Sequence, residues 1–135
     1  MHKAAIMGDT GVIKGLLMDK AETDTLDKDM CTPLCLAIRQ ENYEAAQVLI
    51  DGGASINLGG GIFVSPIHLA IVRLNIQIIK SLIGKGADLK KVDSEGNTPL
   101  HLVMNIFSKN PEICTKVLEL LLEKLNGVLI NQRNK

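Results

Sequence analysis

The chain has 135 residues with 15 basic and 15 acidic side chains, and 46% of its residues are apolar. This length fits one ordinary domain, and the balanced charge lacks the clustered Lys and Arg that nucleic acid or an anionic membrane would require. Aromatic residues make up only 2% of the chain and Trp is absent. The core must therefore come from Ala, Leu, Ile and Val, which suits closely stacked helices better than a β-sandwich anchored by large rings.

The cysteine count and the start of the chain point to an intracellular protein. Three cysteines, an odd number, argue against a disulfide framework. Gly8, Asp9 and Lys14 interrupt the apolar stretch that a secretory signal would need. No apolar run approaches the roughly 18 residues of a membrane span. We therefore expect a cytoplasmic location, with the nucleus also open, and no direct insertion into a membrane.

A spacing of 33 residues runs through the chain. The same motif recurs as Thr32-Pro33-Leu34-Cys35-Leu36-Ala37, Ser65-Pro66-Ile67-His68-Leu69-Ala70 and Thr98-Pro99-Leu100-His101-Leu102-Val103. His2 and Ala4-Ala5 fall in register with these motifs. A period this strict indicates one structural unit copied along the chain. We place the units at about 1–30, 31–63, 64–96 and 97–135.

Each unit predicts two short helices. In the first two units the second helix is marked by Val12, Ile13, Leu16 and Leu17, and by Glu44 to Asp51 with Gly52-Gly53. In the third unit, Ser65 is expected to cap the first helix by accepting from a helical N–H, with Pro66 at the first helical position. The second helix spans Ile76 to Ile83 with one apolar stripe, and Gly84 and Gly86 suit its left-handed end.

The units depart from one another at a few positions. Lys20 stands where Gly53 and Gly86 stand, and Met30 and Phe63 replace the turn glycine Gly96. The fourth unit is longer, and we expect a six-residue insertion around Ser108 to Ile113, with two more residues near Leu125-Asn126 before Gly127.

The two ends of the chain are apolar. The last helix, from Val117 to Leu125, is apolar all round, and the first helix pair is little better. Short helices gain their stability from neighbouring copies, and a free solenoid needs polar capping repeats. We therefore expect either a window of a longer array or ends that associate with each other.

Several matched positions give the chain a family resemblance. The Thr-Pro-Leu-His-x-Ala motif, a Leu-Leu or Leu-Ile pair about fourteen residues later, and Gly-Ala before an Asp-x-x-Gly turn resemble the ankyrin repeat. The resemblance covers the whole chain. It implies an all-α, ankyrin-type helical solenoid of stacked helix-turn-helix repeats with β-turn fingers. It also implies a non-catalytic scaffold that binds another protein through finger loops and concave inner helices, without a cofactor.

The family pattern also implies where a partner binds. Partners are held by finger residues and by the two variable positions after the Ala pair, which are Ile6-Met7 in the first unit. The predicted partner-binding residues are Lys28, Asp29, Met30, Arg39, Gln40, Ile62, Phe63, Val64, Val72, Arg73, Ser94, Glu95, Asn97, Asn105 and Ile106. The triplet 62–64 is either tucked against the next finger or exposed for a partner. Arg39 and Arg73 either grip a carboxylate or are only solvated.

Chemical sites find little support in the sequence. Cys31, Cys35, His68 and His101 raise a metal hypothesis, but equivalent positions in stacked helices lie roughly 8–10 Å apart, and zinc binds its ligands at about 2.0–2.3 Å. We expect these histidines to bond the backbone or a hydroxyl of a neighbouring turn. Cys35 is predicted to be a small buried filler with no base nearby. Phosphate loops and paired carboxylates on an apolar stripe are absent, so no enzyme activity is expected.

Two alternatives to the scaffold remain open. The first is the regulatory ankyrin portion of a larger enzyme or ion channel whose chemistry lies outside this chain. More 33-residue copies beyond Lys135 would favour a scaffold, whereas apolar spans or a kinase-like set would favour this alternative. The second is binding of a small molecule or lipid in the concave groove, which predicts a ligand-dependent melting temperature.

Overall fold

The computed structural model describes residues 1–57 and 65–133, with only the backbone of 125–133. These residues form helices and loops, with no strand among them. The helices are α1 (His2–Met7), α2 (Thr10–Met18), α3 (Pro33–Arg39), α4 (Tyr43–Asp51), α5 (Pro66–Arg73), α6 (Ile76–Gly84), α7 (Pro99–Ile106) and α8 (Pro111–Arg133). Each odd-numbered helix is joined to the next one by a short connector, so the helices follow one another as pairs.

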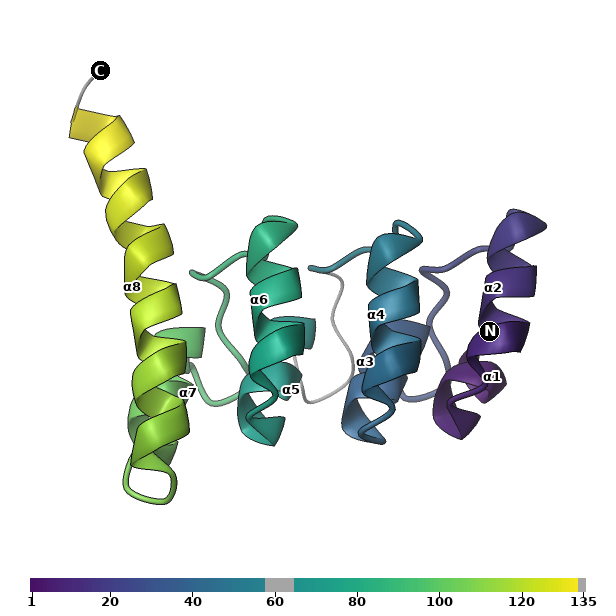
Figure 1. Ribbon diagram of the computed structural model, residues 1–135, viewed down its shortest axis with the longest axis horizontal. Coiled ribbons are helices and arrows are strands. Elements are labelled where there is room, and N and C mark those ends of the chain that lie inside the picture. Colours follow the sequence, from purple (N-terminus) through teal and green to yellow (C-terminus); the bar gives the residue numbers. More distant parts are fainter. Residues whose placement is uncertain (58–64, 134–135) are drawn as a thin grey trace.

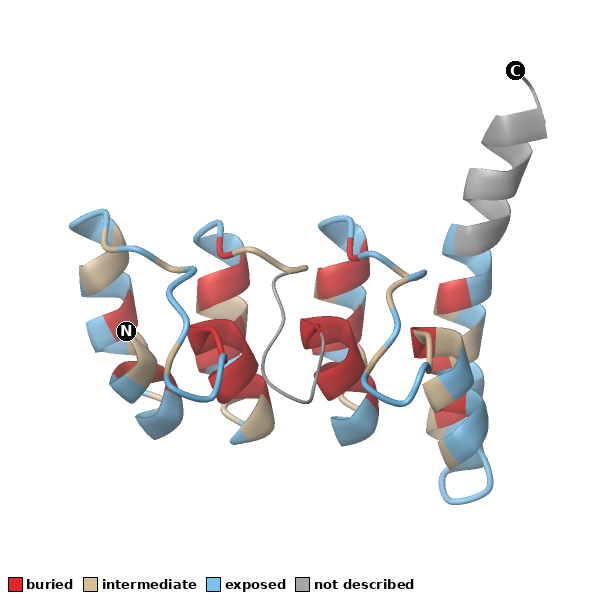
Figure 2. Cartoon of the chain, turned by 180° about the vertical axis from the view of Figure 1, so that it is seen from behind, coloured by how far each residue is buried: buried red, intermediate tan, exposed pale blue. Residues whose placement is uncertain are grey.

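The pairs stack side by side into two layers (Figure 1). In one layer α1, α3, α5 and α7 contact each other in sequence, and in the other α2, α4, α6 and α8 do so. Between α2 and α3, and between α6 and α7, the chain leaves the stack as a loop, and we call these loops the fingers (Figure 1). The inner helices α3 and α5 are almost entirely buried (Figure 2). The predicted all-α helical solenoid is confirmed.

The repeated Thr/Ser-Pro step starts the inner helices. Pro33, Pro66 and Pro99 each occupy the first helical position, where the missing N–H costs nothing. The Thr32 and Thr98 hydroxyls accept from the N–H groups of residues 35 and 101, at 3.2 and 3.3 Å. These bonds satisfy helix N–H groups that have no partner within the helix.

The expected cap at Ser65 is wrong. Ser65 is the residue before the helix, but its hydroxyl bonds the His68 Nδ1 and accepts from no helical N–H. The reason is that His68 Nε2 donates to the Asn97 carbonyl, which leaves Nδ1 without a proton and in need of a donor. The hydroxyl supplies that donor.

The backbone repeats even where the glycine does not. The left-handed turn that ends the second helices is formed by Gly53 and Gly86, and Lys20 adopts it too, with φ of 58°. Met30 likewise takes the conformation of Gly96, with φ of 64° against 81°. A side chain at such a φ is strained. The register of the stack therefore imposes the turn, and the sequence tolerates the cost.

The fourth pair departs from the other three in its connector and in its last helix. Residues 74–75 join α5 to α6, whereas residues 107–110 join α7 to α8. Leu74 turns through the left-handed region, but Phe107 stays helical because the longer connector needs no such turn. The expected six-residue insertion is thus only partly right, since the connector gains two residues and the rest lengthens the helix. The two further residues near Leu125-Asn126 lie within α8, which continues to Arg133.

Candidate functional site

Histidines tie successive pairs together on the inside of the stack. His2 Nε2 lies 3.0 Å from the Cys31 carbonyl, and His68 Nε2 lies 3.0 Å from the Asn97 carbonyl. Each carbonyl belongs to the finger that precedes the next inner helix. Burial lowers the pKa of His68, so its ring is neutral and holds its proton on Nε2. His68 therefore has the structural role that the sequence predicts, and His2 makes the equivalent contact in the first pair.

Two described fingers share one tight turn. Asp27 Oδ1 accepts from the N–H groups of Asp29 and Cys31, at 2.8 and 2.9 Å. Asp93 Oδ1 accepts in the same way from Glu95 and Asn97, both at 2.9 Å. The Cys31 N–H lowers the pKa of Asp27, which keeps this carboxylate charged. Both aspartates are thus engaged in hydrogen bonds within their own turn. The exposed residues that follow each aspartate remain available to a partner.

Neighbouring fingers are also joined to each other. The Asp24 carboxylate accepts from the Ser55 N–H at 2.7 Å, and the Asn57 amide oxygen accepts from the Asp88 N–H at 2.8 Å. These bonds repeat with the 33-residue spacing of the chain. The fingers and the inner helices α1, α3, α5 and α7 together form one side of the molecule, the finger face (Figure 2).

Most predicted partner-binding residues that the structure describes lie exposed on the finger face. The exposed ones are Lys28, Asp29, Met30, Gln40, Val72, Arg73, Ser94, Glu95 and Asn105. The half-buried ones are Arg39, Asn97 and Ile106. Ile62, Phe63 and Val64 lie outside the described residues. Asn97 is largely used by the fold, because its carbonyl accepts from His68 and its N–H donates to Asp93.

The two predicted arginines contact each other across adjacent pairs. Arg73 Nη2 donates to the backbone carbonyl of Arg39 at 2.9 Å, and Arg39 Nη1 lies 3.7 Å from the Cys31 sulfur. These bonds hold both guanidinium groups on the finger face. An arginine has further N–H donors beyond one such bond, so each can still bind an acceptor on a partner. The two guanidinium groups are therefore held in place and still have free N–H donors.

Sequence reasoning missed several exposed apolar residues. Leu26 and Val92 occupy the same register position in the first and third fingers, and both are exposed. Met104 is exposed on α7, although the residues in its register are buried in the other pairs. The signal for the two finger residues was an apolar side chain recurring at twice the repeat spacing in an otherwise polar loop. The exposure of Met104 could not be read from its own register.

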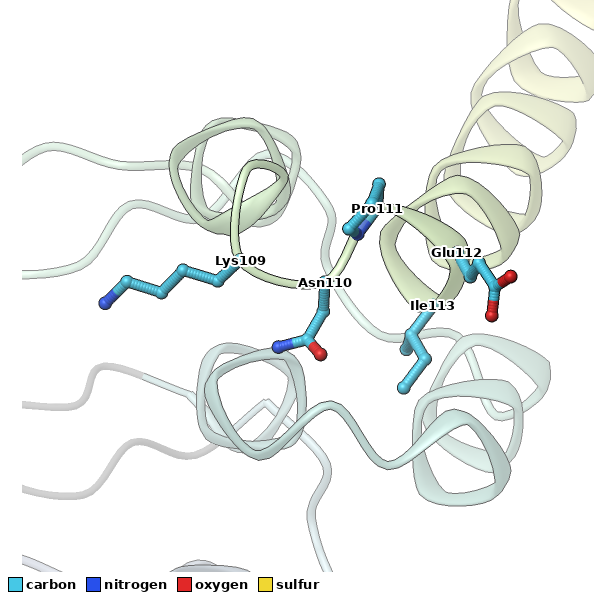
Figure 3. A pocket seen from close by; sticks show the side chains of 5 residues that line it. All are labelled: Lys109, Asn110, Pro111, Glu112 and Ile113. Carbon is cyan, nitrogen blue, oxygen red and sulfur yellow. The ribbon is translucent and has the colours of Figure 1, made fainter.

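Two hollows lie on the surface among the residues that the structure describes. One hollow of about 310 Å³ is lined by Lys109, Asn110, Pro111, Glu112 and Ile113. Its two charged side chains, Lys109 and Glu112, point away from each other (Figure 3). A second hollow of about 280 Å³ lies between α4 and α6 and is lined by Tyr43, Glu44, Gln47, Gln77 and Ile78.

The thiols are buried, and the buried polar side-chain atoms that the structure describes are hydrogen-bonded within the protein. Burial raises the pKa of the Cys35 thiol to about 11, and it also raises the pKa of Cys31 and Cys114. These thiols therefore stay protonated and unreactive at neutral pH. Among the described residues no cluster of His, Cys, Asp or Glu could hold a metal ion. Within the same part of the chain, every buried side-chain nitrogen and oxygen has a hydrogen-bond partner.

Comparison with known proteins places this architecture in a family. The sequence model of the ankyrin repeat matches residues 29–60 and 95–135, which is more than half of the chain. The chain belongs to the ankyrin repeat family. Ankyrin repeats are generally non-catalytic modules that bind other proteins.

The relatives are much longer than this ankyrin chain. Inversin from Gallus gallus is 30% identical over 138 residues, which cover 100% of this chain and 12% of that protein. A putative palmitoyltransferase, ZDHHC13 from Danio rerio, is 34% identical over 76% of this chain and 16% of its own length. Ankyrin repeat and SOCS box protein 9 from Mus musculus is 26% identical over 95% of this chain and 47% of its own length. The chain thus spans less than half of each.

None of the helices, as far as the structure describes them, is both long and apolar enough to cross a membrane.

Proposed function

We propose that this ankyrin chain is a non-catalytic scaffold that binds another protein through its finger face. The observation that carries the proposal is that buried structural positions and exposed variable positions alternate within each repeat. The residues of the Thr/Ser-Pro motif are largely buried and bonded to the fold, whereas the variable positions beside them are mostly exposed on one side. The exposed side chains are not needed for packing, and they recur along a rigid stack. Such a surface suits a binding module.

The chemistry of the finger face favours a partner with both apolar and acidic groups. Met30, Val72 and Val92 are exposed apolar side chains on this face, and Arg39 and Arg73 are cations held near its centre. A few buried anchor residues, arginine among them, supply most of the free energy of a protein interface, and the guanidinium group pairs well with carboxylates. We infer that the partner inserts apolar side chains beside at least one carboxylate.

The absence of catalytic activity is supported by the state of the reactive groups. A nucleophilic cysteine needs a lowered pKa and a base nearby. Here burial raises the pKa of all three thiols. His68 could act as such a base only if its Nδ1 were available, but this atom is bonded to Ser65.

Affinity capture from cytosolic extract with quantitative mass spectrometry tests the proposal. We expect Val72→Glu, and Arg39→Ala combined with Arg73→Ala, each to lose the same captured protein. Phe63→Ala tests the finger triplet in the same assay. The matched control is Lys80→Ala on α6, whose exposed side chain lies outside the finger face. Unchanged recovery by the folded finger-face variants would contradict the proposal, as would equal loss with the control.

The alternative is that this array regulates a larger enzyme or channel. The observation that favours it is that one relative, named as a putative palmitoyltransferase, matches the chain over only 16% of its length. Sequencing the full-length transcript distinguishes the two proposals. Further repeats favour the scaffold, whereas a catalytic or membrane-spanning region favours the alternative.

A further inference from the structure

Two rows of variable positions run across the C-terminal ends of the inner helices. Members of one row are 33 residues apart and belong to α1, α3, α5 and α7, which contact each other in sequence. Packed helices stand roughly 8–10 Å apart, so each row repeats its side chains at about that distance. The first row is Ile6, Arg39, Val72 and Asn105, and the second row is Met7, Gln40, Arg73 and Ile106.

The first row places a cation between two apolar side chains. Ile6 and Val72 are each 46% exposed, and the half-buried Arg39 lies on the helix between theirs. Val72 belongs to a central pair, so its exposure is a property of the row and not of an end of the stack. The two rows together contain two arginines and no carboxylate. A partner that complements the first row offers an apolar, an acidic and a second apolar group in that order.

The spacing of the row selects the backbone of the segment that can follow it. In a polyproline II helix three residues make one turn with a rise of about 3.1 Å each, so side chains three apart share a face every ~9.3 Å. This distance matches the roughly 8–10 Å between packed helices. A β-strand repeats one face every ~6.6 Å. An α-helix repeats a face every ~10.5 Å, over seven residues, and drifts about 20° at each step. The polyproline II helix therefore fits the row best.

The second row supplies donors for the backbone of such a segment. A polyproline II helix has no internal hydrogen bonds, so its carbonyl groups are open to a partner. Gln40 is exposed, and its side-chain amide carries two N–H donors. Arg73 Nη2 donates to the Arg39 carbonyl at 2.9 Å, which holds the guanidinium group beside Arg39 and leaves its other N–H groups for a new acceptor. Backbone donors thus lie next to the cation of the first row.

We propose that the finger face binds a polyproline II segment of its protein partner that carries an apolar, an acidic and a second apolar residue at steps of three. The two apolar side chains pack on Ile6 and Val72, and the carboxylate accepts from Arg39. This inference rests on the proposed function and names the segment that is bound. If such a segment does not bind while the finger-face variants still lose the captured protein, this inference fails and the scaffold function stands.

Fluorescence anisotropy with a labelled peptide tests the spacing. The probe has leucine at its first and seventh positions and glutamate at its fourth, with proline and serine at the positions between them. In the control peptide the glutamate moves to the fifth position and the composition is unchanged. We expect the control to bind about fivefold more weakly, because its carboxylate no longer faces Arg39. Equal affinity of the two peptides would overturn the proposal.

A pair of valines tests the path of the segment along the inner helices. Val72 and Val92 are both 46% exposed, but Val92 lies in a finger and outside the rows. Val72→Ser is expected to weaken binding of the probe about fivefold, because an apolar contact is lost. Val92→Ser is expected to bind the probe like wild type. Equal losses in the two variants would contradict a segment that follows the first row.

Charge reversal tests the contact with Arg39. Arg39→Glu is expected to lose binding of the probe and to regain it with a peptide in which lysine replaces the glutamate. Lys28→Glu makes the same change of charge on an exposed finger residue and is expected to bind the probe like wild type. Circular dichroism checks that each variant is folded. The proposal would be overturned if folded Arg39→Glu gained nothing from the lysine peptide. Tighter binding of a helical peptide with leucine, glutamate and leucine at steps of seven would also overturn it.

Discussion

The two inner pairs and the two outer pairs of this stack use the same register with different results. In the inner pairs, α3–α4 and α5–α6, both layers have a neighbour on each side and the repeated apolar positions are buried. In the outer pairs the same positions are buried only on the side that has a neighbour. Burial in a solenoid is thus a property of the neighbour as much as of the residue. The inner pairs supply the rigid frame, and the outer pairs supply surface.

The largest expected effect comes from truncating Ile71 in a central pair, compared with the same truncation at Met104 in the last pair. Ile71 is fully buried, whereas Met104, in the same register, is exposed. We expect Ile71→Ala to lower the free energy of unfolding by about 2–5 kcal/mol, because it leaves a cavity. Met104→Ala is expected to change it by about 0.5 kcal/mol or less. Urea denaturation of the monomeric chain measures both. Equal losses would contradict the comparison.

A smaller effect is expected where the first pair docks on the second. Asn42 Nδ2 donates to the carbonyls of Ala5 and Ile6 at 3.0 and 2.7 Å. Asn42→Ala leaves the end of α1 without these bonds and should cost about 1–3 kcal/mol. The cost is expected as faster hydrogen exchange in α1 and α2 only.

Asn75→Ala is the matched control for this docking contact. Asn75 has the same register but caps α6 by accepting from the Ile78 N–H at 2.9 Å. Its loss should weaken the start of α6 by about 1 kcal/mol and leave α1 unchanged. Faster exchange of α1 in the Asn75 variant would show that the two contacts are not separate.

The free energy of unfolding is also expected to depend on pH through His68. Burial lowers the pKa of this histidine below its ordinary 6.5, so the unfolded chain binds the proton more readily than the folded chain. The free energy of unfolding should therefore fall as the pH drops through 6.5 toward the lower folded value. His68→Gln should lose this part of the pH dependence. The measurement is urea denaturation at several pH values, and an unchanged slope in the variant would exclude His68 as its source.

The smallest effect concerns strain in the first pair. Lys20 adopts a left-handed φ of 58°, whereas Gly53 and Gly86 fill the same register position. Lys20→Gly should raise the free energy of unfolding by up to about 1 kcal/mol, because glycine tolerates this conformation. Gly86→Ala should lower it by a similar amount, since nothing lies within 4 Å of the added methyl group and only the conformation is affected. Thermal denaturation resolves the two directions, and a loss with Lys20→Gly would contradict the account.

The sequence predicts the frame well because the frame is periodic. The Pro33, Pro66 and Pro99 ladder places the start of the inner helices, and the apolar stripes place the outer helices. The family match and the helical stack confirm the ankyrin solenoid. At Ser65, however, the hydrogen-bond partner depends on which tautomer the buried His68 adopts, and that is set by the distant Asn97 carbonyl. Spacing along the chain does not contain this information.

The surface was less predictable than the frame. The exposure of Met104 depends on what lies beside α7, and its register alone predicts burial. The connector between α7 and α8 was also not predicted correctly from the repeat. A length difference in the sequence does not show whether the extra residues lie in a loop or in a helix. The roles of the predicted partner-binding residues stay predictions, because binding specificity lies in positions that the repeat leaves free.

Native-state hydrogen exchange tests the central contrast between inner and outer pairs most directly. The account predicts the slowest exchange in the amides of α3 to α6, with faster exchange in α1 and α2 and in the second half of α8, measured on the monomeric chain. Neighbours on both sides cause the slow exchange, because opening an inner pair breaks two inter-pair contacts and opening an outer pair breaks one. Uniform protection from α1 to α8 would contradict the account.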